Sequence, residues 1–320
     1  MNAPLLQVKN LRVEFAGRPA VRDVNFDLTS GETIGLVGES GSGKSTLARA
    51  LLRLLQPEQG SVEFSGLDLL KSTPAAMRAQ RRDLQIIFQD PLASLNPRMT
   101  VGGAIAEPLL IFEPELSAAA RWGKVVAMLE RVGLAAGMAK RYPHEFSGGQ
   151  CQRIGIARAT VLRPKLLVCD EAVSSLDVSI QGQIINLLLD LQQEMGMAML
   201  FISHNLAVVR HLSHRVLVMY LGKLVEAASC EALFAAPVHP YTRALLSAVP
   251  RIPPVAGARA STPLAEASLA ADSIERGCAF RDRCPYALPL CASSDPPLAE
   301  IAAGRWVACH RSHETLNPLF

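Results

Sequence analysis

The stretch GESGSGKST, residues 38–46, decides the fold of this chain. It fits the pattern G-x-x-x-x-G-K-[ST], in which glycines let backbone N–H groups converge on phosphate oxygens at the start of a helix. The apolar residues Thr33 to Val37 predict a buried strand before the loop. Leucines recur at helical spacing after Lys44 and predict a helix that runs until Pro57. Strand, glycine loop and helix in this order predict a site for a nucleoside triphosphate.

Two side chains of this loop have specific expected roles. Lys44 is expected to reach the β and γ phosphates, and the Ser45 hydroxyl is placed to ligate Mg²⁺. The alternative is a glycine-rich turn that binds nothing, and the flanking strand and helix disfavour it. The residues expected to contact nucleotide here are Gly38, Glu39, Ser40, Gly41, Ser42, Gly43, Lys44, Ser45 and Thr46.

Bulk composition narrows the class of protein. With 320 residues, 49% of them apolar, the chain is long enough for one large domain and an appendage. A formal net charge of +3 gives no large single-sign field, so no nucleic acid is expected as a partner. Apolar runs such as residues 197–202 are far shorter than the roughly 18 to 20 residues of a spanning helix. An odd number of cysteines and no secretion-signal pattern favour a reducing cytoplasm.

The order of apolar segments predicts an α/β core. The runs KLLVCDE and MAMLFISH suit buried parallel strands, and a helical pattern with apolar residues from Ile180 to Leu191 separates them. A mainly helical subdomain is expected at about residues 90–160. The nucleotide-binding domain is therefore predicted to span residues 1–248, with a mostly parallel sheet at its centre.

Composition changes after this domain. Residues 249–276 are rich in proline, alanine and serine and have no periodicity, which predicts a linker. Residues 277–320 form a cysteine-rich segment with many prolines, which is typical of a small unit that needs a staple.

Two acidic residues follow the run LLVC. A strand terminus can aim the Asp170 carboxylate at the coordination shell of Mg²⁺. A surface acidic pair is the alternative for Asp170 and Glu171, but four apolar neighbours would bury these carboxylates at a cost that a metal or base role would justify. His204 follows the run MLFIS, and by itself a histidine at a strand end is more often structural.

The segment FSGGQCQRIGIARA, residues 146–159, resembles the signature of the ATP-binding-cassette family. The resemblance covers about residues 5–250. The signature residues Ser147, Gly148, Gly149 and Gln150 place glycines before a helix and create a second phosphate site. One nucleotide cannot fill both sites of one chain. The resemblance therefore implies a sandwich of two chains, in which each ATP lies between Lys44 of one and the signature of the other.

Membership of this family would assign further roles. Glu171 resembles the residue that polarises the attacking water, and His204 the residue that contacts the γ-phosphate. Gln89 matches a glutamine that touches Mg²⁺ and links the nucleotide to the helical subdomain. Residues 175–177 resemble a loop that crosses the dimer interface. Phe15 stands where family members stack an aromatic ring on adenine, with an ordinary core phenylalanine as the alternative.

Several segments are similar to those of oligopeptide and dipeptide permease ATPases, in particular the F-type ATP-binding subunit: FQDPLASLNPR, DVSIQ, HPYTRALLSAVP and the cysteine tail. This resemblance implies a P-loop NTPase of the cassette fold, with an antiparallel β subdomain and a C-terminal extension. It implies ATP hydrolysis coupled to peptide uptake. The implied partners are a D-type cassette ATPase, two transmembrane permease subunits and an external substrate-binding protein, with this chain at the cytoplasmic face of the inner membrane.

Other functions stay open beside peptide import. Importers of nickel or another small solute share the same ATPase pattern, because the selecting pocket lies in other chains. A soluble cassette ATPase in DNA repair or translation usually carries two cassettes or long coiled-coil insertions, which this sequence lacks. A regulatory subunit with little chemistry is disfavoured by Glu171. The sequence departs from the broader pattern at Ala172, Asn205 and Cys151, and we expect Cys151 to be a packed thiol.

Four cysteines in the tail predict a metal centre: Cys278, Cys284, Cys291 and Cys309. Four sulfurs suit either Zn or an iron–sulfur cluster. The spacing lacks the C-x2-C pairs usual for zinc, and the resemblance to permease ATPases favours a 4Fe-4S cluster. Two disulfides or free thiols are the alternatives.

Overall fold

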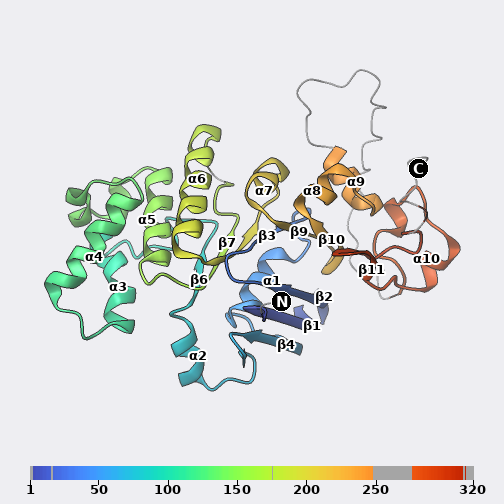
Figure 1. Cartoon of the computed structure of the whole chain (residues 1–320), viewed down its shortest axis with the longest axis horizontal. Coiled ribbons are helices and arrows are strands. Elements are labelled where there is room, and N and C mark those ends of the chain that lie inside the picture. Colours follow the sequence, from blue (N-terminus) through green and yellow to red (C-terminus); the bar gives the residue numbers. More distant parts are fainter. Residues whose placement is uncertain (1–2, 16, 175, 248–275, 313, 315–320) are drawn as a thin grey trace.

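The computed structural model of the chain describes residues 3–15, 17–174, 176–247, 276–312 and 314 (Figure 1). Its strands form a four-stranded sheet in the order β2-β1-β4-β5 and an eight-stranded sheet in the order β11-β12-β10-β9-β3-β8-β7-β6. The strands are β1 (Leu6–Phe15), β2 (Arg18–Leu28), β3 (Thr33–Val37), β4 (Gln59–Phe64), β5 (Leu67–Asp68), β6 (Leu84–Ile87), β7 (Leu166–Asp170), β8 (Ala198–Ile202), β9 (Arg215–Tyr220), β10 (Lys223–Ser229), β11 (Ala299–Ala302) and β12 (Arg305–Val307).

Helices surround these sheets. The α-helices are α1 (Lys44–Leu51), α2 (Pro74–Gln80), α3 (Val101–Phe112), α4 (Ala118–Arg131), α5 (Gly148–Thr160), α6 (Val178–Met195), α7 (Leu206–Leu212), α8 (Cys230–Ala235), α9 (Pro240–Ser247) and α10 (Pro289–Ser293). The short 3₁₀ helices are η1 (Ala136–Lys140), η2 (Pro143–Glu145) and η4 (Arg281–Arg283). In Figure 1, α3 and α4 lie at one end of the molecule, and α10 lies at the other.

The core of the larger sheet is parallel, as the sequence predicts. β3 pairs with β8 and β9, and β7 pairs with β6 and β8, all in parallel register. Every residue of β3, β7 and β8 is buried, because both faces of these strands are covered. Leu200 and Ile202 face a core shared with α1 and the antiparallel sheet, whereas Phe201 faces the core on the side of the helical region.

The helix after the glycine loop is shorter than predicted. α1 ends at Leu51 rather than continuing to Pro57. Arg53 adopts a positive φ of 50°, which a continuing right-handed helix does not permit. Its guanidinium Nη1 donates hydrogen bonds to the carbonyls of Leu69 and Ser72, so tertiary contacts end the helix before the leucine pattern does.

The C-terminal residues extend the main sheet. β12 pairs with β10 in antiparallel register, with Ala227 opposite Trp306. Glu226 of β10 is completely buried and accepts hydrogen bonds from the backbone N–H groups of Val238 and His239, and from Arg305 of β12 at 3.4 Å. A buried carboxylate with this many donors is satisfied, and it links β10 to the tail. The predicted linker, residues 249–276, lies almost wholly outside the described residues.

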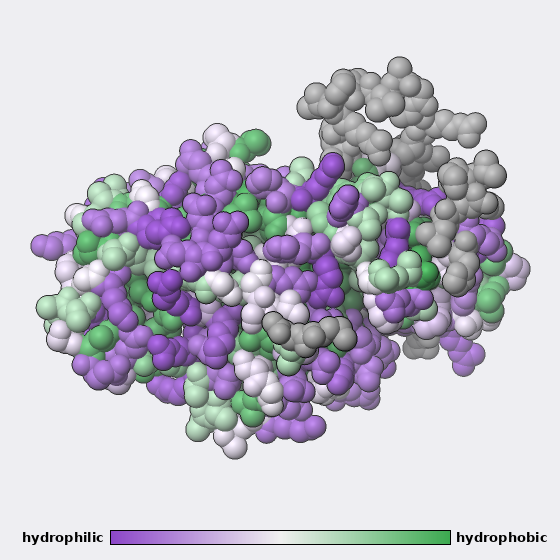
Figure 2. All heavy atoms as spheres, in the orientation of Figure 1, coloured by the Kyte–Doolittle hydropathy of each residue, from purple (hydrophilic) through white to green (hydrophobic). Residues whose placement is uncertain are grey.

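The outer surface is mixed in polarity. Figure 2 shows hydrophilic residues over most of the visible face, with hydrophobic residues scattered among them. Within the described ranges, none of the helices combines the length and the apolar character that membrane crossing requires.

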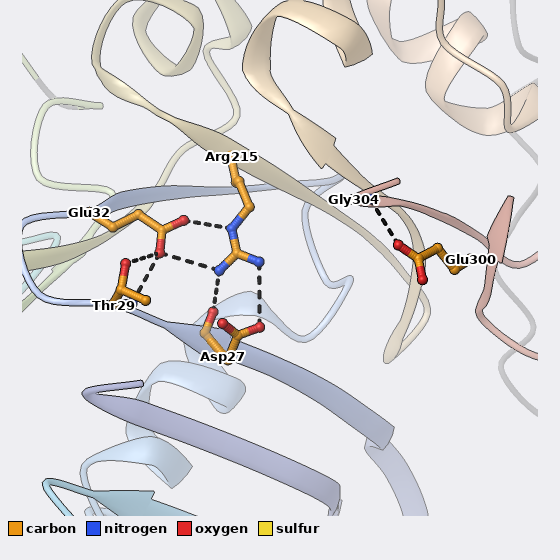
Figure 3. Close-up of polar contacts among 6 residues, drawn as sticks. All are labelled: Asp27, Thr29, Glu32, Arg215, Glu300 and Gly304. Atoms are coloured by element: carbon orange, nitrogen blue, oxygen red, sulfur yellow. Dashed lines mark hydrogen bonds and ion pairs between the residues drawn. The ribbon is translucent and has the colours of Figure 1, made fainter. Parts of the chain in front are cut away.

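One arginine joins the two sheets near the start of β3 (Figure 3). Arg215, at the start of β9, donates to Glu32 Oε1 at 2.5 Å and to the carbonyl oxygen of Asp27 at 2.5 Å. Thr29 donates to Glu32 through both its backbone N–H and its hydroxyl. Burial alone would raise the pKa of Glu32, but these hydrogen bonds outweigh it and hold that pKa below the ordinary value. Figure 3 also shows the contact of Glu300 with the Gly304 backbone that closes the β11–β12 turn.

Removing Arg215 should therefore destabilise the fold in a pH-dependent way. We expect Arg215→Gln to lower the free energy of unfolding at pH 7 by about 1–3 kcal/mol, because a charged hydrogen-bond partner of Glu32 is lost. A depressed folded-state pKa gives stability that is present above the unfolded pKa and lost as pH falls through the folded pKa. The difference between variant and wild type should thus shrink below about pH 4.

Denaturant unfolding at several pH values measures this difference. The exposed Lys9→Gln is the control, and it should change stability by less than about 0.5 kcal/mol. A deficit in Arg215→Gln that is equally large at pH 3 and pH 7 would contradict the assignment to Glu32.

Candidate functional site

The glycine loop lies between β3 and α1, as predicted, and its shape requires glycine at one position in particular. Gly43 has φ of 101° and precedes the first residue of α1. A Cβ at this position would lie 2.2 Å from the carbonyl oxygen of Ala20. Any other residue would thus be strained and would also collide with backbone. The start of α1 therefore packs directly against the backbone of β2.

Lys44 is buried inside the loop that it belongs to. Its ammonium donates hydrogen bonds of 2.8 Å to the carbonyl oxygens of Gly38 and Glu39, and lies 3.4 Å from Ser42 Oγ. Burial lowers the pKa of Lys44, and the nearby carboxylates of Glu171 and Asp170 oppose that shift. The loop carbonyls therefore hold the Lys44 ammonium in place, and an anion that enters the loop can take over these hydrogen bonds.

Ser45 and Asp170 meet directly. The Ser45 hydroxyl donates to Asp170 Oδ1 at 2.8 Å, although the two residues are 125 positions apart in the sequence. Asp170 is the last residue of β7 and is buried. Burial raises the pKa of its carboxyl, and the hydrogen bond from Ser45 partly opposes this rise. An oxygen pair of this kind matches the preference of Mg²⁺ for one or two carboxylates beside phosphate oxygens.

Glu171 is turned away from the strand that precedes it. Its φ is 49°, an unusual backbone conformation for a residue other than glycine, and its N–H donates to the Ile202 carbonyl at 3.1 Å. Gln89 Nε2 donates to Glu171 Oε2 at 3.0 Å, and His204 Nδ1 lies 3.7 Å from Glu171 Oε1. Non-glycine residues with a strained backbone tend to cluster at functional sites, and the positive φ of Glu171 is such a strain.

The polar residues gather at one edge of the parallel sheet. Gly38 follows β3, Glu171 follows β7, and His204 follows β8. Gln89 follows β6, which pairs with β7. Ligands of open α/β sheets bind outside the carboxyl ends of the strands, where these side chains lie.

The segment 147–150 lies at the start of α5. Ser147 caps this helix: its hydroxyl accepts from the Gln150 N–H, and the Gln150 side chain accepts from the Ser147 N–H at 3.0 Å. A Cβ on Gly149 would lie 2.8 Å from Ile180 of α6, so glycine permits close packing there. Ser147 and Gly148 are exposed, and in the described part of the chain this segment makes no hydrogen bond with the glycine loop.

The remaining predicted positions are Phe15, the loop of residues 175–177, and Cys151. Phe15 ends β1 with 48% of its surface exposed, so its ring is open to contact from outside the domain. Ser175 lies outside the described residues, whereas Asp177 is the N-cap residue that precedes α6. Cys151 is a packed thiol, as expected, and its Sγ lies 3.5 Å from the Pro143 carbonyl oxygen.

The predicted metal centre in the tail is wrong. Among the residues that the structure describes, which include Cys278, Cys284, Cys291 and Cys309, no group of His, Cys, Asp or Glu side chains is arranged to hold a metal ion. Burial raises the pKa of Cys284 to about 11, and it also raises the pKa of Cys278 and of Cys309. The described residues of the tail thus offer no site for the predicted 4Fe-4S cluster or for zinc.

Sequence reasoning missed contacts around Glu39. Its backbone N–H donates to the Tyr241 hydroxyl at 2.8 Å, and its carboxylate accepts two hydrogen bonds of 2.8 Å from Arg283. Arg283 lies 244 positions away, and no spacing rule connects the two residues.

Comparisons with known proteins agree with this arrangement. A family model described as "ABC transporter" matches residues 21–174, and one described as "Oligopeptide/dipeptide transporter, C-terminal region" matches residues 225–291. The oligopeptide transport ATP-binding protein OppF of Haemophilus influenzae is 51% identical, covering 95% of this chain and 93% of its own length. OppF of Escherichia coli is 51% identical over 92% of each chain. A probable peptide ABC transporter ATP-binding protein of Sinorhizobium fredii is 53% identical, covering 91% and 82%.

Solved structures show the same fold. A dimeric ATP-binding cassette in a post-hydrolysis state, bound to ADP and Pi, is similar with a TM-score of 0.65 and 26% identity, covering 70% of this chain and 98% of that one. The protein cbiO1 of Clostridium perfringens, part of the ABC transporter complex cbiONQ, has a TM-score of 0.67 and 26% identity, with 73% and 92% covered.

The loop geometry yields a direct prediction. Gly43→Ala should weaken nucleotide binding at least tenfold, because the new Cβ forces the loop off the Ala20 carbonyl and away from its phosphate-binding shape. Gly123→Ala in α4 is the matched control: it meets nothing within 4 Å, and alanine there should leave binding unchanged and slightly raise stability. Titration with a fluorescent ATP analogue measures both, and equal affinity in the two variants would refute the steric argument.

Proposed function

Because the chain belongs to the ATP-binding-cassette transporter family, we propose that its hydrolysis of ATP drives the import of oligopeptides or dipeptides across a membrane. The observation that carries the chemistry is the convergence of loop, carboxylates, amide and imidazole at one sheet edge. The peptide cargo rests on end-to-end likeness to oligopeptide transport ATP-binding proteins, including the match of residues 225–291. Residues 1–248 act as the nucleotide-binding domain, and residues 277–320 form its C-terminal extension.

Lys44 exchanges partners when nucleotide binds. In this structure the loop carbonyls of Gly38 and Glu39 hold its ammonium. Phosphate oxygens carry more negative charge than carbonyls, so they draw the ammonium to the β and γ phosphates. Backbone N–H groups from Gly41 to Thr46 surround the phosphates at the start of α1, and the Phe15 ring supports the base.

The oxygens of Ser45 and Asp170 fit a magnesium ion. They already lie 2.8 Å apart, and Gln89 donates a hydrogen bond to Glu171, the residue that follows Asp170. Mg²⁺ bound there with the phosphates would neutralise charge on the transferring phosphoryl group. The raised pKa of Asp170 reflects a buried carboxylate that a cation would stabilise in its charged form.

Glu171 polarises the attacking water. Its carboxylate is oriented by a hydrogen bond of 3.0 Å from Gln89. His204 lies 3.7 Å from the same carboxylate, where its ring can contact a γ-phosphate next to Glu171. His204 is largely exposed, so a phosphate has access to its ring. The mechanism needs the water to lie between Glu171 and the γ-phosphate, in line with the leaving oxygen.

The signature segment serves a second chain. Ser147 and Gly148 are exposed at the start of α5 and make no hydrogen bond with their own glycine loop within the described ranges. A helix N-terminus with free N–H groups attracts phosphate, and the partner's nucleotide supplies it. We assign that partner as a D-type cassette ATPase, with two transmembrane permease subunits and an external binding protein completing the importer at the cytoplasmic face of the inner membrane.

Replacing the water-polarising carboxylate separates binding from chemistry. Glu171→Gln should keep nucleotide affinity near that of wild type, while ATP turnover at this site falls roughly 10²-fold or more. The exposed Glu130→Gln of α4 is the control and should leave turnover unchanged. Single-turnover hydrolysis by the assembled complex measures the effect. Unchanged turnover in Glu171→Gln would assign the chemistry to the partner's site instead.

The cargo is tested with the complete importer. We expect ATP-dependent uptake of short peptides by the complex in vesicles, and loss of uptake with Lys44→Ala, because the variant cannot hold the phosphates. A panel of peptides, with nickel and other small solutes beside them, identifies the substrate. Uptake of a metal ion or other small solute, with no peptide transported, would overturn the proposed cargo but leave the ATPase assignment intact.

A further inference from the structure

The C-terminal segment, residues 277–320, contacts the phosphate loop through Arg283. Arg283, at the end of η4, donates from Nη1 to Glu39 Oε2 and from Nη2 to Glu39 Oε1, each at 2.8 Å. Both carboxylate oxygens are engaged, so this is a two-pronged ion pair, the strongest and most directional form of such a contact. Glu39 is the second residue of the phosphate loop, and the pair therefore joins the chain's tail to its nucleotide site.

The arginine is held from several sides. Its side chain is only 10% exposed, and the guanidinium lies 5.7 Å from the ring centroids of Tyr220 and Phe280. Nη1 also lies 3.4 Å from the Tyr220 hydroxyl. The hydrogen bonds to Glu39 raise the pKa of Arg283 above its ordinary value. A planar guanidinium stacked on aromatic rings loses little freedom when it pairs, so the geometry of the contact is fixed in advance.

A cluster of aromatic rings ties this arginine to the body of the domain. Tyr220 of β9, Tyr241 of α9 and Phe280 of the C-terminal segment pack together, with ring centroids 4.6 to 5.5 Å apart. Tyr241 is fully buried, and its hydroxyl accepts the Glu39 N–H at 2.8 Å. The cluster thus binds the backbone N–H of Glu39 through Tyr241, while Arg283 binds the Glu39 carboxylate.

Glu39 is also a partner of the lysine that binds phosphate. Its carbonyl oxygen accepts from Lys44 at 2.8 Å, next to the Gly38 carbonyl. The Glu39 residue is therefore restrained at three groups: its N–H by Tyr241, its carboxylate by Arg283, and its carbonyl by Lys44. The contacts of Glu39 with Tyr241 and Arg283 do not involve Lys44, so they persist when the ammonium turns to phosphate. A loop restrained by these two contacts loses less conformational entropy when a nucleotide binds.

We propose that Arg283 is a positioning residue for ATP binding, through which the C-terminal segment holds the phosphate loop in its binding shape. Among the described residues the arginine makes no hydrogen bond with Lys44, and it acts on the loop through Glu39. Its loss should therefore weaken the binding of ATP more than it slows the chemical step. The C-terminal segment becomes part of the nucleotide site even though it adds no contact to the nucleotide.

Substitutions at both ends of the pair test this inference. Arg283→Gln should raise the KM for ATP and the Kd of a fluorescent ATP analogue roughly three- to tenfold, with kcat of the assembled complex changed less than twofold. Glu39→Gln should have a similar effect, and the double variant should be no worse than either single one, because both remove the same interaction. The exposed Arg276→Gln, at the start of the same segment, is the control and should match wild type.

Conservative and reversed variants separate positioning from folding. Arg283→Lys keeps the charge but cannot form the two-pronged contact, so it should restore only part of the affinity while the melting temperature stays near that of wild type. The reversed pair, Glu39→Arg with Arg283→Glu, should recover more affinity than either of its single changes. If Arg283→Gln proves unfolded, Arg283→Lys decides the question. Wild-type KM and Kd in a folded Arg283 variant, whether or not the melting temperature has dropped, would overturn the proposal.

Discussion

The nucleotide site of this molecule depends on the parallel pairing of β3 with β8, of β8 with β7 and of β7 with β6. These strands run in one direction, so their carboxyl ends meet at one edge of the sheet. Gly38, Glu171 and His204 follow three neighbouring strands and are brought to this same edge. The strands can be buried on both faces only because α1 with the antiparallel sheet covers one side and the helical region covers the other.

Much of this arrangement follows from local sequence patterns. The strand Thr33–Val37, the glycine loop and the start of α1 were predicted because each has a local physical cause: a buried apolar run, glycines, and helical spacing. The strands β7 and β8 followed from apolar runs of strand length. The end of α1 was predicted too late, because the contacts of Arg53 with Leu69 and Ser72 lie outside any local pattern.

The tail shows where sequence reasoning fails. Four cysteines in a short segment suggested a metal site, but the spacing of thiols along a chain does not fix where their sulfur atoms lie. The segment is held instead by the pairing of β12 with β10, by Arg305 on the buried Glu226, and by Phe280 in an aromatic cluster. The pair of Arg283 with Glu39 was equally hidden, since it joins residues from opposite ends of the chain.

These contacts change how the phosphate loop is understood. The loop is restrained from below by the Ala20 carbonyl at Gly43, from inside by Lys44, and from the C-terminal side by Arg283. In the account proposed here, the loop forms half of a nucleotide site whose other half is the signature of a partner chain.

A structure of the complete importer with Mg²⁺ and a non-hydrolysable ATP analogue tests this claim most directly. The account predicts that the Lys44 ammonium leaves the Gly38 and Glu39 carbonyls for phosphate oxygens, that the pair between Arg283 and Glu39 persists, and that Ser147 of this chain faces the nucleotide of its partner. A nucleotide enclosed by the loop and the signature of one and the same chain, or one bound away from Lys44, would contradict it.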